Sequence, residues 1–130
     1  MVAVELGEVS EAAGATEEYE ADIATFEGAL QRHSWDEDAG YFSYVVHDES
    51  GRPTGPLKHA SGANFNMGVD GASPLFAGAC TPDQERTLIG KLTDSSHLWS
   101  DNGLSVVDRA APYYSTDGMF NGGVWMIHQW

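Results

Sequence analysis

The apolar residues in the first third of the chain follow a helical period. Four of them recur at spacings of four, three and four, which places them on one face of an α-helix. They are Tyr19, Ile23, Phe26 and Leu30. Thr16 is a favoured N-cap residue, and the two glutamates after it suit the positive end of the helix dipole. The pattern predicts a helix of about five turns over residues 16–33.

Two more helices are predicted in the middle of the chain. Ser73 and Pro74 resemble a cap and a first helical residue ahead of a short apolar run. Thr81 and Gln84 form a capping-box pattern with a proline between them, which indicates a helix from there to about residue 93.

Strand signals are scarcer than helix signals. A turn pattern, Asp-Ala-Gly, ends at Gly40, and an aromatic and β-branched run follows it, which predicts one short β-hairpin. Residues 47–56 are rich in glycine and proline and are predicted as a loop. Residues 94–121 form a long polar connection, and a loop of this length is usually functional. The fold class predicted from these elements is mainly α.

The net charge of the chain limits the kinds of molecule that it is expected to bind. The formal net charge is −14, with two lysines and four arginines. Such a surface repels phosphate backbones and lacks the basic patch that holds proteins to anionic membranes, so neither nucleic acid nor a membrane is expected as a partner. The acidity fits either a high-salt habitat or ordinary solvated helix faces.

The sequence predicts neither a cofactor nor a metal site. The single cysteine and five scattered histidines have no metal-binding spacing, and no phosphate-loop pattern occurs. The N-terminal residues lack the basic and apolar pattern of a signal peptide, which predicts a cytoplasmic location.

Carboxylates are numerous but hard to rank from sequence. Asp36, Asp70 and Asp108 each lie beside aromatic or apolar residues, where burial could raise the pKa of a carboxyl group. We favour the interpretation that each is a turn or cap residue, so no catalytic residue is predicted.

Aromatic and amide side chains give the strongest functional signal. They alternate in the predicted loops, and the run over residues 119–130 holds three large aromatic residues together with Asn121, His128 and Gln129. Core packing is the usual fate of aromatic residues. Rings that stack and amides that specify are nevertheless what a carbohydrate cleft requires.

Four motifs in order carry a resemblance to a known family. They are Trp35-Asp36-x-x-x-Gly40-Tyr41-Phe42, the stretch from Pro74-Leu75-Phe76 to Gln84, Gly103-Leu104-Ser105-Val106-Val107, and Asn121-Gly122-Gly123-Val124-Trp125. Together they resemble the catalytic domain of glycoside hydrolase family 63 and its relatives, which include processing α-glucosidases, mannosylglycerate hydrolases and, more distantly, trehalases.

The resemblance implies both a fold and a mechanism. The fold would be an α/α toroid of six helical hairpins, and residues 1–130 would be one undivided part of it: three to four helices, a short hairpin and long loops. The rest of the toroid would be missing from this chain. Relatives invert the anomeric carbon with an acid and a base, and both residues lie outside the stretch that this chain matches.

The resemblance also implies which residues contact the substrate, a carbohydrate with an α-glycosidic bond. The predicted binding residues are Phe120, Asn121, Gly122, Trp125, Trp35, His128 and Gln129, with Trp125 as the wall on which a sugar stacks. The isolated chain would then bind a sugar and lack glycosidase activity. Two alternatives stay open: a non-catalytic carbohydrate-binding module, and a helical interaction module whose acidic face docks a basic partner.

Overall fold

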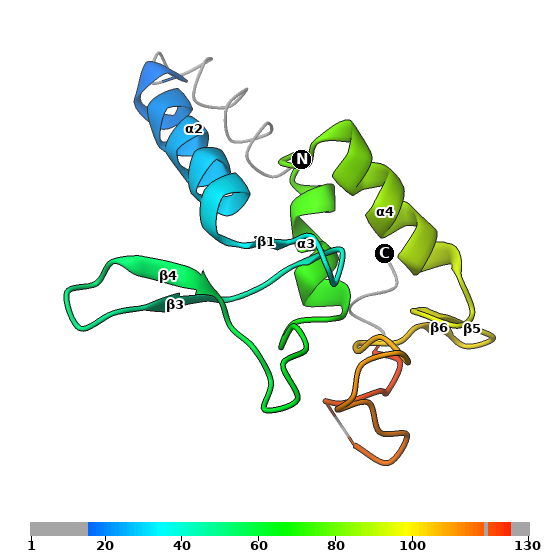
Figure 1. Cartoon of the computed structure of the whole chain (residues 1–130). Helices are drawn as coiled ribbons and strands as arrows, with labels where there is room; N and C mark the ends of the chain where they lie inside the picture. Colours follow the sequence, from blue (N-terminus) through cyan, green and yellow to red (C-terminus); the bar gives the residue numbers. More distant parts are fainter. Residues whose placement is uncertain (1–15, 119, 126–130) are drawn as a thin grey trace.

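A computed structural model describes residues 16–118 and 120–125 (Figure 1). Within these residues, the regular structure consists of three helices and three two-stranded antiparallel sheets. The helices are α2 (Thr16–His33), α3 (Val69–Phe76) and α4 (Pro82–Thr93). The sheets pair β1 (Trp35–Asp36) with β2 (Tyr41–Phe42), β3 (Val45–His47) with β4 (Pro53–Pro56), and β5 (Trp99–Ser100) with β6 (Gly103–Leu104).

The prediction of a mainly α fold, part of a six-hairpin α/α toroid, is wrong. The described residues mix helices with three separate β-hairpins, and strand β4 and the β5–β6 hairpin occupy stretches that the sequence predicted as loops. Their strands have two to four residues, which is too short for an alternating pattern to emerge from the sequence. Turn chemistry fixes them instead: Asp48 Oδ1 accepts hydrogen bonds from Ser50 N and Arg52 N between β3 and β4.

Helix α2 ends at His33 as the sequence predicted, and Thr16, predicted as its cap, is helical and the first described residue. Its apolar stripe is only partly covered. Leu30 packs against the core, whereas Tyr19 is 49% exposed and Phe26 is 73% exposed. Arg32 and His33 end the helix with the basic charge that its C-terminus favours.

Helix α3 begins five residues before the predicted start, so the cap assigned to Ser73 is wrong. Pro74 lies inside the helix and cannot donate a hydrogen bond to the carbonyl of Asp70. Ser73 Oγ donates to that carbonyl instead, at 2.7 Å, which makes the proline tolerable. Gly71 is needed because a Cβ there would lie 2.0 Å from the carbonyl oxygen of Asn66.

Helix α4 confirms the capping box. Thr81 Oγ1 accepts from Gln84 N at 3.4 Å, and Gln84 Oε1 accepts from Thr81 N at 2.9 Å. The same Gln84 side chain exchanges hydrogen bonds of 2.8 and 2.9 Å with Gln31, so the cap also ties α4 to α2.

The core lies where α3 meets β2 and α4. Its fully buried members are Tyr41, Phe42, Ala72, Leu88 and Leu98. Figure 1 shows α3 in the middle of the molecule, with α2 on one side and α4 on the other, and the β3–β4 hairpin extending away. The chain after α4 returns through β5 and β6 toward the start of α3, which brings residues 106–108 close to residues 67–69.

Candidate functional site

A cleft of about 450 Å³ lies where segments distant in the sequence meet at the start of α3. Three backbone hydrogen bonds hold these segments together. Val69 N donates to Val106 O at 3.1 Å, Asp108 N donates to Met67 O at 2.9 Å, and Val106 N donates to Gly123 O at 3.0 Å. The cleft floor is therefore built on main-chain pairing, which fixes the position of the side chains around it.

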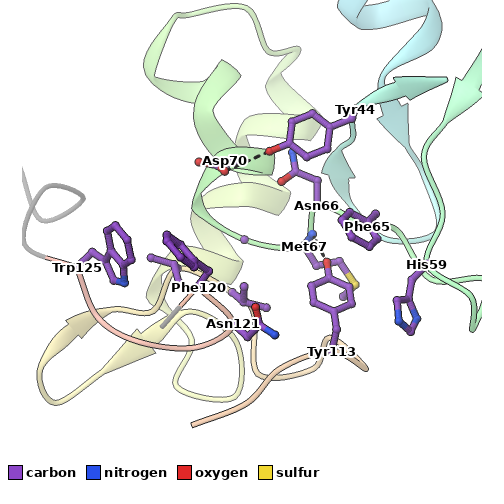
Figure 2. A pocket seen from close by; sticks show the side chains of 13 residues that line it. Tyr44, His59, Phe65, Asn66, Met67, Asp70, Tyr113, Phe120, Asn121 and Trp125 are labelled. Carbon is purple, nitrogen blue, oxygen red and sulfur yellow. Dashed lines mark hydrogen bonds between the residues drawn. The ribbon is translucent and has the colours of Figure 1, made fainter. Parts of the chain in front are cut away.

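One end of the cleft carries an aromatic pair, Phe120 and Trp125. Their ring centroids are 4.9 Å apart with an interplanar angle of 43°, and Figure 2 shows the two rings side by side. Phe120 is exposed, so its ring is available to a ligand. Both residues belong to the run over residues 119–130, whose aromatic and amide side chains gave the strongest functional signal in the sequence.

The other end carries a second aromatic group, formed by His59, Phe65 and Tyr113 (Figure 2). Phe65 and Tyr113 stack at 5.7 Å, and His59 lies 5.5 Å from Tyr113, measured between ring centroids. The Tyr113 hydroxyl accepts from Met67 N at 2.7 Å and donates to the Asn64 carbonyl at 3.1 Å. These bonds lock the ring in place, and burial raises the pKa of Tyr113, so the phenol stays neutral.

Polar side chains lie between the two aromatic groups. The Tyr44 hydroxyl donates to Asp70 Oδ2 at 3.3 Å. Burial, followed by the charge and hydrogen bond of Asp70, raises the pKa of Tyr44 and keeps it a donor. Among the described residues, the second oxygen of Asp70 and the side-chain amides of Asn66 and Asn121 have no hydrogen-bond partner. The cleft therefore offers both donors and acceptors to a ligand.

The other two aspartates considered from the sequence lie outside the cleft. Asp108 is fully buried, and its carboxylate accepts from Tyr41 Oη at 2.7 Å and from Ala110 N at 2.8 Å, with His97 Nδ1 at 2.8 Å. Asp36 is ion-paired with Lys58.

Asp36 is held as a charged structural group. Burial raises the pKa of Asp36, but hydrogen bonds from Lys58 and Asn64 outweigh the burial, and the net pKa lies below the usual value. The same Asn64 accepts from Asn66 N at 2.7 Å, which links this buried pair to the loop that carries the second aromatic group.

The structure brings together three of the residues predicted to contact substrate. Phe120, Asn121 and Trp125 line the cleft. Trp35 does not line it, because its ring packs edge-on against Phe42 at 4.9 Å beside the core. His128 and Gln129 lie outside the described residues.

Gly122, the remaining predicted residue, serves the loop that carries these side chains. A Cβ at Gly122 would lie 2.6 Å from the carbonyl oxygen of Ser115 and 2.7 Å from the Tyr114 ring. The turn closes by a hydrogen bond of 2.9 Å from Ser115 N to Asn121 O. Only glycine allows this close approach, so Gly122 positions Asn121.

Sequence reasoning did not select Tyr44, Asp70 or His59 for the site. Tyr44 was visible as one of many loop aromatics, and Asp70 was assigned to a turn or cap. Asp70 does lie in the first turn of α3, where such residues are common. Its place in the cleft depends on the long-range pairing with residues 106–108, which no local pattern shows.

The described residues contain neither a cluster suited to a metal ion nor a membrane-spanning helix. Within residues 16–118 and 120–125, no three acidic, histidine or cysteine side chains are grouped so as to hold a metal ion. No helix of the described chain is long and apolar enough to cross a membrane. Asp70 is the one carboxylate among the described residues that line the cleft.

Comparisons with known proteins give one structural neighbour by fold and one family by sequence. No curated protein matches the chain in sequence. A solved structure described as a sialidase is similar, with a TM-score of 0.71 and 13% sequence identity. The similarity covers 98% of this chain and 11% of that chain, so this chain spans about a tenth of its length. At this identity the similarity concerns the fold alone.

The sequence itself matches a family described as the mannosylglycerate hydrolase MGH1-like glycoside hydrolase domain, over residues 2–130. This confirms the resemblance that the four ordered motifs indicated, and it supports a glycoside hydrolase-related role. Because the match spans nearly the whole chain, this chain belongs to the mannosylglycerate hydrolase MGH1-like glycoside hydrolase domain family.

Proposed function

We propose that this chain supplies the substrate-binding wall of a glycoside hydrolase that cleaves α-glycosidic bonds with inversion. The observation that carries the proposal is the cleft with Phe120 and Trp125 at one end and unfilled hydrogen-bonding groups next to them. A pyranose ring has apolar C–H faces and a rim of hydroxyls, so stacking and hydrogen bonding together recognise it. Family membership supports the same class of ligand.

The proposal assigns specific tasks to the cleft residues. Trp125 and Phe120 stack on the face of one sugar ring, and Asn121, next to Phe120, bonds its hydroxyls. On the opposite side, the Asn66 amide accepts from and donates to hydroxyls, and the Asp70 carboxylate accepts from them. The group of His59, Phe65 and Tyr113 then holds a second sugar ring or the leaving group at the other end of the cleft.

The proposal leaves the acid and base outside the described cleft. An inverting glycosidase places two carboxyl groups roughly 6.5–9.5 Å apart, one on each side of the bond it breaks. Asp70 alone, among the described lining residues, carries a carboxyl group. We therefore expect this chain by itself to bind a sugar without hydrolysing it.

Binding is tested with neutral probes, maltose and methyl α-mannoside, by isothermal titration of the whole chain. Trp125→Ala is expected to weaken binding by about tenfold, because a buried stacking contact contributes roughly 0.5–1.5 kcal/mol beyond its apolar area. Trp99→Ala is the matched control, since Trp99 is an exposed tryptophan that does not line the cleft. Equal weakening by both variants, or no binding of either sugar, would contradict the proposal.

Turnover is tested with an aryl α-glucoside. The proposal predicts no release of the aryl group above the rate in buffer. Release that Asp70→Asn abolishes would show that the chain holds a working acid or base, and the binding-wall assignment would then be wrong.

The family description names mannosylglycerate, a glycoside with a carboxylate on its non-sugar part. The proposal is limited to α-glycosides as a class, because nothing in the described cleft selects glycerate.

A further inference from the structure

Two of the four asparagines in the sequence are followed by glycine, and one of these two lines the cleft (Figure 2). They are Asn102, before Gly103, and Asn121, before Gly122. An asparagine loses its side-chain amide when the backbone nitrogen of the next residue attacks Cγ and closes a succinimide ring. Glycine favours this attack, because it has no side chain to shield the nitrogen and its backbone turns freely. Both positions are chemically able to cyclise, and the fold decides between them.

The other two asparagines are protected by the residue that follows each of them. Phe65 N, after Asn64, donates to a backbone carbonyl at 3.1 Å. Met67 N, after Asn66, donates to the Tyr113 hydroxyl at 2.7 Å. A backbone N–H that donates gives up its proton only when its hydrogen bond opens, so neither nitrogen is free to attack.

The peptide between Asn102 and Gly103 is held inside the β5–β6 hairpin. Gly103 pairs with Ser100 in the register of the two strands, and Ser100 Oγ donates to Gly103 O at 2.6 Å. Asn102 N donates to Ser100 Oγ at 3.2 Å. Ring closure at Asn102 would therefore break the turn of the hairpin.

The peptide between Asn121 and Gly122 lies in an exposed turn and is held less firmly. Among the described residues, neither the Asn121 side-chain amide nor Gly122 N has a hydrogen-bond partner. Gly118 leaves room beside the Asn121 side chain, since a Cβ there would lie 2.9 Å from Asn121 Cβ. The hydrogen bond from Ser115 N to Asn121 O is the bond that ring closure has to open.

We propose that Asn121 is a site of spontaneous deamidation and that this modification disables the Phe120–Trp125 end of the cleft. Gly122 N bonds to Asn121 Cγ, the Cγ–Nδ2 bond breaks, and the proton from Gly122 N leaves with Nδ2 as ammonia. Water then opens the succinimide ring at one of its two carbonyls and leaves aspartate or isoaspartate. The reaction needs no oxidant, because water is the co-reactant.

Both products change the part of the cleft around residue 121. Aspartate has a carboxylate that only accepts, so the donor that the amide offers to a sugar hydroxyl is lost. Isoaspartate also routes the backbone through the side chain, which moves Gly122, and a Cβ at Gly122 would already lie 2.6 Å from the carbonyl oxygen of Ser115. The loss of sugar binding rests on the proposed function, whereas the modification itself does not.

Trypsin separates the two candidate sites. Cleavage after Lys91 and Arg109 places Asn102 in residues 92–109 and Asn121 in residues 110–130. The whole folded chain is kept at mildly alkaline pH, and mass spectrometry of both peptides follows the conversion of amide to carboxylate. Asn121 should react at least about fivefold faster than Asn102, because an ordinary hydrogen bond at Gly103 has to open before its nitrogen can attack. In urea, where the hairpin is lost, the two rates should lie within about twofold of each other.

The effect on the cleft is tested with maltose and the variant Asn121→Asp, which reproduces the aspartate product. This variant should weaken maltose binding about fivefold, the contribution of one hydrogen bond, and the deamidated chain should lose at least as much. Asn102→Asp is the matched control, because it adds the same charge outside the cleft and should leave the affinity for maltose unchanged.

The outcomes separate the modification from its effect on binding. Equal rates at the two sites in the folded chain, or faster reaction at Asn102, would overturn the assignment of Asn121 as the modified residue. Unchanged maltose binding in Asn121→Asp and in the deamidated chain would overturn the assigned loss of binding. If the fresh chain binds no maltose, the proposed function and the loss of binding fail together, and the ratio of the two rates still decides the modification.

Discussion

Two tyrosine–aspartate pairs in this chain have the same chemistry and opposite settings. Tyr41 donates to Asp108 at 2.7 Å inside the core, where both residues are fully buried. Tyr44 donates to Asp70 at 3.3 Å in the cleft, where both residues are exposed. The hydroxyl and carboxylate are alike, so only the surroundings distinguish the two pairs.

The structural pair and the binding pair differ in how many hydrogen bonds the carboxylate of each can still accept. Asp108 is saturated, because Ala110 N and His97 Nδ1 also contact its oxygens. Asp70 has one oxygen without a donor among the described residues. A buried carboxylate must be satisfied by the protein itself, whereas a carboxylate in a cleft can be satisfied by a ligand.

The largest expected effect comes from removing the buried carboxylate. Asp108→Ala leaves the Tyr41 hydroxyl and His97 without their partner, and we expect it to lower the free energy of unfolding by about 3–5 kcal/mol. Urea denaturation followed by circular dichroism measures this loss.

The matched change in the cleft is Asp70→Ala. It removes an acid from the first turn of α3 and the exposed, 3.3 Å hydrogen bond from Tyr44, and should cost less than about 1 kcal/mol. Losses of similar size in the two variants would remove the distinction between the pairs.

A smaller effect is expected from the tyrosines at alkaline pH. Burial, with the hydrogen bond and charge of Asp108, raises the pKa of Tyr41 far above its usual value. Above about pH 10 the unfolded chain loses the tyrosine proton while folded Tyr41 keeps it, so stability falls as pH rises. Tyr41→Phe cannot ionise and should flatten this fall above about pH 10.

Tyr44→Phe is the comparison for that measurement. Tyr44 is half exposed, so its raised pKa reflects weaker burial, and its replacement should leave most of the alkaline fall in place. At neutral pH, Tyr41→Phe should also cost about 1.5–3 kcal/mol, the value of a hydrogen bond to a charged group. An unchanged alkaline slope in Tyr41→Phe would show that Tyr41 ionises as readily in the folded chain as in the unfolded one.

The elements predicted correctly from the sequence are those with local causes. Thr81 and Gln84 are three residues apart, so their capping box shows in the sequence and occurs in the structure. Helix α2 likewise occurs where the helical period from Tyr19 to Leu30 predicted it, and it ends at His33 as expected. Residues 69–72 were not predicted as helix, because Gly68 and Gly71 resemble loop residues. The reason for Gly71 is its close approach to Asn66.

The residues of the site also fall into two groups: those that a local sequence pattern indicates, and those that only long-range contacts bring together. Phe120, Asn121 and Trp125 are neighbours in sequence and also line one cleft, so a local run was enough to select them. Asp70 and Tyr44 are 26 positions apart and meet because α3 packs against β2, a long-range contact that no local pattern shows. Trp35 was predicted to bind substrate because it is an aromatic residue beside a turn. Its ring packs against Phe42 instead.

The most direct test of the central claim is a map of where a neutral sugar binds. In two-dimensional amide NMR of the whole chain, maltose should shift signals of residues 44, 66–70 and 120–125. Signals around Asp108 and His97 should not move, because that pair is already satisfied within the core. Shifts centred on the core pair or on α2, or no shifts at saturating maltose, would contradict the assignment of the cleft as a sugar-binding site.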